Sequence, residues 1–511
     1  MANPDLAAES HTTTVKDVKQ LGIWAALGSL GYVFWICGGM EMVERLAYYG
    51  VRSVASLYAT DAESNGGLGL TGTDIGIIFT VWAFVQSFVP VVTGGISDRV
   101  GYKETIFAST VFKILGYLIM AWFSNFWGFM AGAIVLAFGT GIFKPGIQAT
   151  IVKSTNRQNS SMAWGVFYQT VNIGGFLGPL VAAQLRQLDW QYVFYANAAI
   201  ISLNFLLLLT YKEVDKDERL AHREKVKSGE VEETSLWLES LKEIARPIMV
   251  WYMVLFSAFW FMLYAFWDVG PLYFRVWVDT SIMVRHIFGE DGTSNRFWIF
   301  FLGMSQDGQR IQPEGLVNLN AMLIMFVCFI VAGWSALLRA TNSMALGTFL
   351  AAATLMVFGG FNYVWLIVLG IVSFSIGEML SSPKSSEYLG NIAPAQKKAM
   401  YLGFSQLPLG IGWSIEGFTG QYLYGRFGAK DTLAREALAD GGMPQAEVDA
   451  VPIGEAFQKL VEVTGQTAEA LTAELYFANE VGIAWFIMGS VGIVAAAGMY
   501  SYGRWTYHLK D

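Results

Sequence analysis

The sequence predicts an all-α polytopic membrane protein. Of its 511 residues, 54% are hydrophobic and only 14% are charged, a ratio that a water-soluble domain of this length could not bury in one core. The excess apolar surface must therefore face lipid. Glycine contributes 54 residues and aromatic side chains 15%, which is typical of helices that approach closely in a bilayer and are anchored at its interfaces.

Twelve apolar segments are long enough to span a hydrocarbon layer of about 30 Å. They form two groups of six, and a hydrophilic stretch separates the groups. The first group covers residues 22–58, 75–97, 104–124, 126–152, 161–186 and 190–211, and the second covers 247–277, 316–338, 343–361, 362–383, 400–424 and 477–502. We therefore expect twelve transmembrane helices arranged as two six-helix bundles.

The hydrophilic segments set the expected domain boundaries and orientation. We expect an N-terminal tail at 1–21, a first bundle at 22–211, a linker at 212–246, a second bundle at 247–502 and a C-terminal tail at 503–511. The second bundle carries two long segments on the opposite side, 279–313 and 425–476. The linker and both tails share their side with basic loop residues such as Lys103 and Lys153, so the positive-inside rule predicts that this side is cytoplasmic. The expected location is a cell membrane, either a bacterial inner membrane or a plasma membrane.

The composition does not support several classes of site and partner. The two cysteines, Cys37 and Cys328, lie inside apolar runs, so neither a disulfide framework nor a thiolate metal site is expected. All four histidines fall outside the apolar segments, which argues against a histidine proton relay or a metal centre within the membrane. The formal charge of -8 indicates no basic surface for nucleic acid. We expect no cofactor, and we expect the lipid bilayer as the surrounding partner.

The first apolar segment carries a row of polar side chains. Glu41, Glu44, Arg45, Tyr48 and Arg52 stand at offsets of 0, 3, 4, 7 and 11, which places all five on one face of a helix. A charge in the middle of a bilayer costs roughly 2.5–3.5 kcal/mol or more, so these residues are expected to be functional and to line a hydrated interior. The alternative is that Glu44 and Arg45 only neutralise each other as a structural pair.

This row lies within a motif that points to a family. Residues Glu41-Met-Val-Glu44-Arg45-Leu-Ala-Tyr48-Tyr49-Gly50 resemble the ExxERFxYYG motif of the proton-dependent oligopeptide transporters, a branch of the major facilitator superfamily. Further matches occur in order along both halves of the chain: Lys144-Pro145, Phe167-Tyr168 with Asn172, Asn320, and Gly377-Glu378 with Ser381-Ser382-Pro383. The loop Gly94–Lys103, which contains Asp98 and Arg99, resembles the motif between helices two and three that is general to the superfamily.

The resemblance implies the major facilitator fold and a proton-coupled symporter that imports di- or tripeptides, or peptide-like small solutes, by alternating access. The proton-coupling residues that it implies are Glu41, Glu44, Arg45 and Glu378. The implied substrate-binding residues are Tyr48, Tyr49, Arg52, Lys144, Asn172, Asn320, Glu378 and Ser382, with Arg52 and Lys144 on the substrate carboxylate and Glu378 and Asn320 on its ammonium. The implied gating residues are the pairs Arg52 with Asp268 and Lys144 with Glu378, together with Asp98 and Arg99.

Departures from the family pattern leave the substrate open. The second apolar segment has Trp82, Phe84 and Phe88 where the family has a tyrosine-rich stretch, and Gly146 replaces an asparagine after the Lys-Pro pair. One alternative is therefore a transporter of another small amino-acid-like or anionic solute. A non-transporting sensor on the same scaffold is a further alternative, whereas a membrane enzyme would need a nucleophile with its base, which the sequence does not display.

Two further charged side chains, Lys113 and Glu416, lie inside apolar segments. Each needs a partner within the membrane, and the sequence does not reveal which residue that is. A functional role and a structural role are both open for these two residues.

Overall fold

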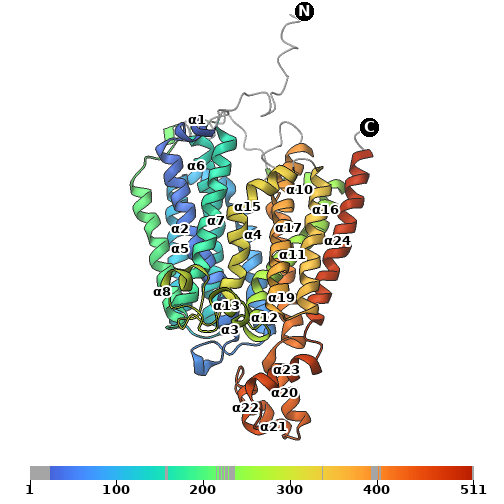
Figure 1. The fold of residues 1–511 in the computed structure, drawn as a ribbon. Coiled ribbons are helices and arrows are strands. Elements are labelled where there is room, and N and C mark those ends of the chain that lie inside the picture. Colours follow the sequence, from blue (N-terminus) through green and yellow to red (C-terminus); the bar gives the residue numbers. More distant parts are fainter. Residues whose placement is uncertain are drawn as a thin grey trace, which may run out of the picture.

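Long α-helices account for most of the described chain (Figure 1). The computed structural model describes residues 23–508, except 156–158, 336–337, 393–400, 402–403 and parts of 215–235. Within this described part, six helices of at least 20 residues precede residue 212: α2 (Tyr32–Arg52), α4 (Gly72–Val100), α5 (Tyr102–Trp122), α6 (Phe126–Ser154), α7 (Ser160–Leu185) and α8 (Trp190–Leu209). Six more follow residue 246: α11 (Pro247–Asp268), α15 (Pro313–Ser335), α16 (Ala340–Gly360), α17 (Val364–Ile392), α19 (Gln406–Phe427) and α24 (Ile483–His508).

The twelve helices form two bundles that meet along two seams. In the first bundle α5 packs against α6 and α2 against α7, and in the second α16 packs against α17 and α24. Between the bundles, α4 packs against α19 and α7 against α15. The fold class predicted from the sequence is therefore confirmed. We call the side at which α2 begins and α24 ends the terminus side, and the opposite side the distal side (Figure 1).

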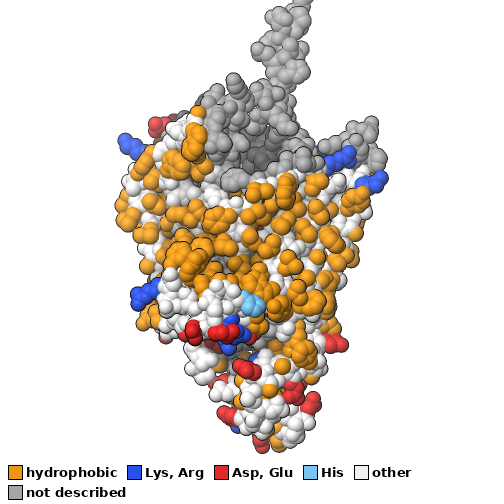
Figure 2. Space-filling model, viewed as in Figure 1, with side chains coloured by type: hydrophobic (Ala, Val, Ile, Leu, Met, Phe, Trp, Pro, Cys, Tyr) orange, Lys and Arg blue, Asp and Glu red, His pale blue; other side chains and the backbone are white. Residues whose placement is uncertain are grey.

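A broad apolar surface covers the bundles. Figure 2 shows hydrophobic side chains over the middle of the visible face, whereas the charged side chains lie near its two ends. Nine of the described helices are long and apolar enough to cross a membrane by length and composition. α2 falls outside this group because it carries four charged residues, and all four are buried among other helices instead of facing lipid.

Two of the expected spans are divided in the structure. The stretch 22–58 forms α1 (Ile23–Gly28), α2 and α3 (Ala55–Thr60), with Gly31 in an extended conformation before α2. The stretch 247–277 forms α11 and α12 (Gly270–Trp277), because Pro271 in the first turn of α12 supplies no N–H to the preceding helix. Nine of the other ten expected spans each overlap a single helix, and the span 477–502 contains the last two residues of α23 (Ala468–Ala478) as well as most of α24. α17 continues to Ile392, beyond its expected end at residue 383.

About half of the expected linker and all of the expected N-terminal tail lie outside the described residues. The linker is not devoid of structure, however, because α10 (Leu236–Ile244) forms within its second half. The expected tail at 1–21 falls entirely outside the described part of the chain.

Short helices cover the distal side. α13 (Ser281–Phe288) and α14 (Arg296–Phe301) occupy the expected segment 279–313. The segment 425–476 contains α20 (Lys430–Asp440), α21 (Gln445–Ala450), α22 (Ala456–Thr464) and most of α23 (Ala468–Ala478), which form a small unit that projects from the distal side in Figure 1.

Lys430 lies inside this unit, where its Nζ donates to Thr472 Oγ1 at 2.6 Å and lies 3.5 Å from the centroid of the Phe457 ring. Burial lowers the pKa of Lys430 to about 8, because the charged ammonium loses hydration there.

The first bundle depends on close contact between α5 and α6. A Cβ atom at Gly116 would lie 2.8 Å from Leu136 N and 2.9 Å from the Gly132 carbonyl oxygen. We expect Gly116→Ala to lower the free energy of unfolding by about 1–3 kcal/mol, because the two helix backbones would have to separate. Thermal unfolding of the purified protein in detergent measures this loss. The control is Gly39→Ala on α2, where the nearest atom to the new Cβ, Leu207 Cδ1, is 3.8 Å away; equal losses in the two variants would contradict the explanation.

Candidate functional site

The polar row of α2 is enclosed by other helices. Glu41 and Glu44 are 0% exposed, and Arg45, Tyr48 and Arg52 are 5%, 4% and 3% exposed. The row therefore does not line an open hydrated space in this conformation, which differs from the expectation from the sequence. Partners on other helices neutralise its charges instead, as buried charges require.

Glu44 is held by two cations. Arg45 donates from Nε to Glu44 Oε2, and Lys113 of α5 donates from Nζ to Glu44 Oε1 at 2.9 Å. Lys113 is 1% exposed, and its Nζ lies 3.9 Å from the centroid of the Phe143 ring. A lysine buried this far requires a counter-ion, because an unpaired charge loses its hydration without compensation. Glu44 is thus the partner of Lys113 that the sequence did not reveal.

Glu41 lies between Arg45 and Lys144. Arg45 Nε is 3.3 Å from Glu41 Oε1, and Lys144 Nζ is 3.8 Å from the same oxygen. Lys144 stands inside α6, and its side chain is 35% exposed, more than any other charged group of this cluster. We define the α2 cluster as three cations, Arg45, Lys113 and Lys144, with two carboxylates, Glu41 and Glu44, so its formal charge is +1. The accessible member of the α2 cluster is therefore a cation.

A second ion pair joins the two bundles. Arg52 at the end of α2 donates from Nη2 to Asp268 Oδ1 at the end of α11, and both side chains are buried. Aromatic rings enclose the guanidinium, whose Cζ is 4.6 Å from the centroid of Phe79, 4.7 Å from that of Trp413 and 5.2 Å from that of Trp82. Trp413 also donates from Nε1 to Asp268 Oδ2 at 3.2 Å. The contact expected between Arg52 and Asp268 is thus present, supported by a cation–π cage and charge-assisted hydrogen bonds.

One carboxyl group of the second bundle has a neutral partner. Asn320 of α15 donates from Nδ2 to Glu378 Oε2 at 3.1 Å, and the same Nδ2 donates to Ser375 Oγ at 3.1 Å. Glu378 and Ser375 both belong to α17, so Asn320 links α15 to α17. Among the described residues no cation forms an ion pair with Glu378. Its charge, when ionised, is therefore uncompensated within this part of the chain.

Polar contacts also tie the bundles together near the distal side. Arg186 at the C-cap of α7 pairs with Glu314 in the first turn of α15, and its Nη2 donates to Gln312 Oε1 at 2.8 Å. Asn318 of α15 donates from Nδ2 to the Phe176 carbonyl oxygen at 2.8 Å. Together with the Arg52–Asp268 pair, these contacts close the seam between the bundles on the distal side.

The amino-acid sequence from residue 40 to residue 417 matches the sequence model of the Major Facilitator Superfamily. The chain belongs to the Major Facilitator Superfamily. A member of this superfamily is a transporter and not an enzyme, and two six-helix bundles with charged groups at their seam agree with that assignment.

The relatives and structural neighbours of this superfamily member are transporters of different kinds. It is 26% identical over 200 residues to the "Uncharacterized transporter YclF" of Bacillus subtilis, a match that covers 38% of this chain and 39% of that protein. It is 23% identical over 358 residues to the multidrug resistance protein MdtH of Edwardsiella ictaluri, which covers 69% of this chain and 78% of that protein. The crystal structure of a peptide transporter POT in complex with sulfate matches with a TM-score of 0.65 at 16% identity, covering 95% of this chain and 98% of that one. At this identity the likeness shows the fold, and the fold implied by the sequence resemblance is confirmed.

The expected gating pair between Lys144 and Glu378 does not form in this conformation of the protein. Lys144 faces Glu41, and within the described residues Lys144 and Glu378 form no ion pair. The reason is the placement of their helices, because the bundles meet through α4 with α19 and α7 with α15, whereas α6 and α17 lie in different bundles and are not packed together. The expectation that these two charges pair is therefore wrong for this conformation.

The structure also places three other predicted site residues. Tyr49 packs against Trp267 of the second bundle, with ring centroids 5.4 Å apart. Asn172 donates from Nδ2 to the Tyr168 carbonyl oxygen on its own helix at 2.8 Å, and Ser382 is half-buried in α17. A contact of these residues with a substrate stays a prediction.

The loop motif near the end of α4 is only partly visible. Asp98 and Arg99 belong to the last turn of α4, but their side chains lie outside what the structure describes. Their gating role stays a prediction.

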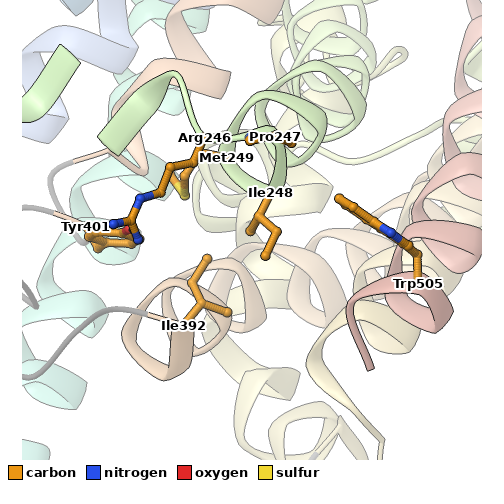
Figure 3. A pocket seen from close by; sticks show the side chains of 7 residues that line it. All are labelled: Arg246, Pro247, Ile248, Met249, Ile392, Tyr401 and Trp505. Atoms are coloured by element: carbon orange, nitrogen blue, oxygen red, sulfur yellow. The ribbon is translucent and has the colours of Figure 1, made fainter. Parts of the chain in front are cut away.

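A separate cavity lies on the terminus side of the second bundle, near the start of α11 and the ends of α17 and α24. Figure 3 shows the side chains that line it. The cavity encloses about 330 Å³, and Arg246, Ile392, Tyr401 and Trp505 are among the residues that line it. Arg246 Nε is 2.9 Å from Glu243 Oε2, so this cation is already neutralised. The lining includes none of the charged residues of the α2 cluster, and we do not assign the cavity to the transport site. In the described residues there is also no group of three or more His, Cys, Asp or Glu placed to hold a metal ion.

Proposed function

We propose that the protein is a proton-coupled symporter that imports di- or tripeptides, or peptide-like small solutes, by alternating access. The observation that carries the proposal is the distribution of charge between the bundles. The α2 cluster has a formal charge of +1 with Lys144 as its accessible cation, whereas Glu378 has only an amide as its described side-chain partner. A solute with a carboxylate at one end and an ammonium at the other would neutralise both sites and bridge the bundles.

The predicted binding residues then divide by role. Lys144 binds the solute carboxylate in this conformation, because Arg52 forms an ion pair with Asp268. Arg52 can bind the carboxylate only after that ion pair breaks. Glu378, held by Asn320, receives the ammonium. The remaining contacts with the solute are assigned to Tyr48, Tyr49, Asn172 and Ser382.

Proton coupling is assigned to Glu41 and Glu378 ahead of Glu44. Arg45 and Lys113 both donate hydrogen bonds to Glu44. Glu41 has Arg45 Nε at 3.3 Å and Lys144 Nζ at 3.8 Å but accepts no hydrogen bond from a described donor, and the partner of Glu378 is an uncharged amide. A carboxyl accepts a proton most readily where charged donors stabilise its ionised form least. Protonation of Glu378 would remove the charge that holds the solute ammonium, which links proton movement to solute release.

The orientation follows from the basic residues of the terminus side, which include Lys103 and Lys153. The positive-inside rule makes this side, with both chain termini, cytoplasmic in a cell membrane. Because the described polar contacts between the bundles close the distal side, the conformation is closed toward the exterior. A solute bound at Lys144 would leave toward the cytoplasm.

A second candidate is a transporter of another small amino-acid-like or anionic solute. Two differences from the peptide transporters favour it: Trp82, Phe84 and Phe88 occupy the position of the tyrosine-rich stretch, and Gly146 follows the Lys-Pro pair. Trp82 belongs to the aromatic cage around Arg52, so this substitution alters the surroundings of a cation that the family resemblance assigns to the substrate.

Uptake into proteoliposomes tests the proposal. Labelled dipeptides are expected to accumulate when the exterior is acidic, and an uncoupler that removes the proton gradient is expected to abolish accumulation. Competition by single amino acids or organic anions, with no dipeptide uptake, would select the second candidate. Folded protein that moves none of these solutes would favour a sensor.

Lys144→Ala is expected to weaken the binding of dipeptides with a free carboxylate by about 1.5–3 kcal/mol, because a charge-assisted hydrogen bond is lost. This corresponds to a Kd raised roughly tenfold to a hundredfold. The corresponding peptide esters should bind the variant and the wild type alike, as measured by calorimetry. Lys103→Ala is the matched control, because Lys103 Nζ donates to the Tyr211 carbonyl oxygen away from the α2 cluster. If acid and ester lose affinity equally, Lys144 does not bind the carboxylate.

A further inference from the structure

Glu416 is a buried carboxyl group without a described hydrogen-bond donor. It lies on α19, which forms a seam with α4 of the first bundle, and its side chain is 0% exposed. Neither of its carboxyl oxygens receives a hydrogen bond from a donor among the described residues. The contrast within the same protein is Glu314, equally buried, which accepts hydrogen bonds from two nitrogens of Arg186.

The group that faces Glu416 is another carboxyl. Asp268 of α11 lies within hydrogen-bonding range of it, and the charged groups acting on Glu416 are Asp268 and Arg52 of α2. Tyr264, a titratable phenol one turn before Asp268 on α11, stacks on Trp413 with ring centroids 4.4 Å apart. On the α4 side the contacts are neutral, such as the hydrogen bond from Thr80 Oγ1 to the Ser414 carbonyl oxygen at 3.1 Å. One cation thus serves two carboxyl groups.

The hydrogen bonds decide which carboxyl is ionised. Asp268 accepts from Arg52 Nη2 and from Trp413 Nε1, so both of its oxygens are occupied by donors that favour the carboxylate. An ionised Glu416 would leave a net charge of −1 inside an enclosure of Phe79, Trp82 and Trp413, with two carboxylates facing each other. Two carboxylates repel, whereas a protonated carboxyl donates to its neighbour.

We propose that Glu416 binds a proton in this conformation and donates it in a hydrogen bond to Asp268, so that α19 contributes a proton-binding site to the contact that closes the distal side. The group is then neutral, and the three side chains Arg52, Asp268 and Glu416 have no net charge. The consequence of this bound proton for transport rests on the proposed function. Transfer of the proton from Glu416 to Asp268 breaks the O–H bond on Glu416 and forms one on Asp268, which leaves Glu416 ionised and Asp268 neutral. Arg52 is then released from α11 for the solute carboxylate.

Infrared difference spectroscopy of the purified protein at neutral pH, without any solute, tests the protonation directly. The C=O stretch of a protonated carboxyl is expected in the wild type and lost in Glu416→Gln. Glu314→Gln is the matched control, and it is expected to lose carboxylate bands instead because Glu314 is paired with Arg186. The proposal is overturned if Glu416→Gln retains the protonated band. A band that Glu416→Gln retains and Asp268→Asn loses would place the proton on Asp268 instead.

Thermal unfolding gives an independent second measurement. Glutamine has the shape and donor capacity of a protonated glutamate, so Glu416→Gln is expected to keep the wild-type melting temperature, whereas Glu314→Gln is expected to lower it. Equal falls in the two variants would show that Glu416 is ionised. Both measurements are made without transport, so a failure of peptide uptake would overturn the proposed function and leave this assignment standing.

Discussion

Asp268→Asn is expected to destabilise the closed distal side by about 3–5 kcal/mol, because it removes the one carboxylate that forms an ion pair with the buried guanidinium of Arg52 among the described residues. The asparagine still accepts the hydrogen bond from Trp413, so the change removes charge while keeping the shape of the side chain. A buried cation without its partner gains hydration only if the seam opens. The variant is therefore expected to populate a conformation in which the distal ends of the bundles are further apart.

Distances between spin labels on the two bundles measure this opening. Labels at Tyr192 on α8 and Tyr363 before α17 lie on exposed distal positions of different bundles, and Cys328 is replaced by serine to prevent stray labelling. The wild type should give one short distance, and Asp268→Asn should add a longer one with a lower melting temperature. An unchanged distance distribution would show that the pair does not hold the bundles together.

The control for this prediction is an exposed ion pair on the distal side. Arg426 Nη1 and Glu436 Oε1 are 2.7 Å apart, and their side chains are 54% and 47% exposed. Glu436→Gln should change stability by less than about 1 kcal/mol, because solvent screens both charges. It should leave the label distances unaltered.

Glu44→Gln is expected to lower the free energy of unfolding by about 3–5 kcal/mol, because it removes a carboxylate that neutralises the fully buried Lys113. Lys113→Met removes the cation from the same pair. Glu44 keeps Arg45 in that variant, so the loss should be smaller. The loss of unfolding free energy in the double variant should be smaller than the sum of the losses in the two single variants. The expected difference is about 0.5–3 kcal/mol, the range of coupling between residues in contact. Unfolding in detergent at several denaturant concentrations supplies the four free energies.

The matching control cycle uses Lys459 and Glu462, whose charges are 3.3 Å apart on side chains that are 44% and 59% exposed. Its coupling should not exceed about 1 kcal/mol. Strict additivity for Glu44 and Lys113 would mean that their contact contributes nothing to the folded state. Such additivity would also favour the alternative in which Glu44 and Arg45 only neutralise each other as a structural pair.

Helix positions were predictable because they depend on local pattern. A run of about 20 apolar residues spans a bilayer whatever surrounds it, and the polar row of α2 follows from the helical repeat. The divisions before Tyr32 and after Asp268 were missed although Gly31 and Pro271 mark them, because an uninterrupted apolar run outweighed single residues in the prediction.

Partners and exposure were decided only by the tertiary structure. Lys113 is 69 positions from Glu44, and Asp268 is 216 positions from Arg52, so no local repeat relates them. The helices that cross near a buried charge determine its counter-ion, because attraction in a medium of low dielectric constant depends on distance and not on sequence order. Lys144 is an example in which the sequence motif did not predict the partner. The family resemblance suggested Glu378, but the bundles meet through other helices. The carboxylate near Lys144 is Glu41, which belongs to the same bundle. The sequence by itself thus determined which charges enter the membrane, and the packing of the two bundles determined which of them meet.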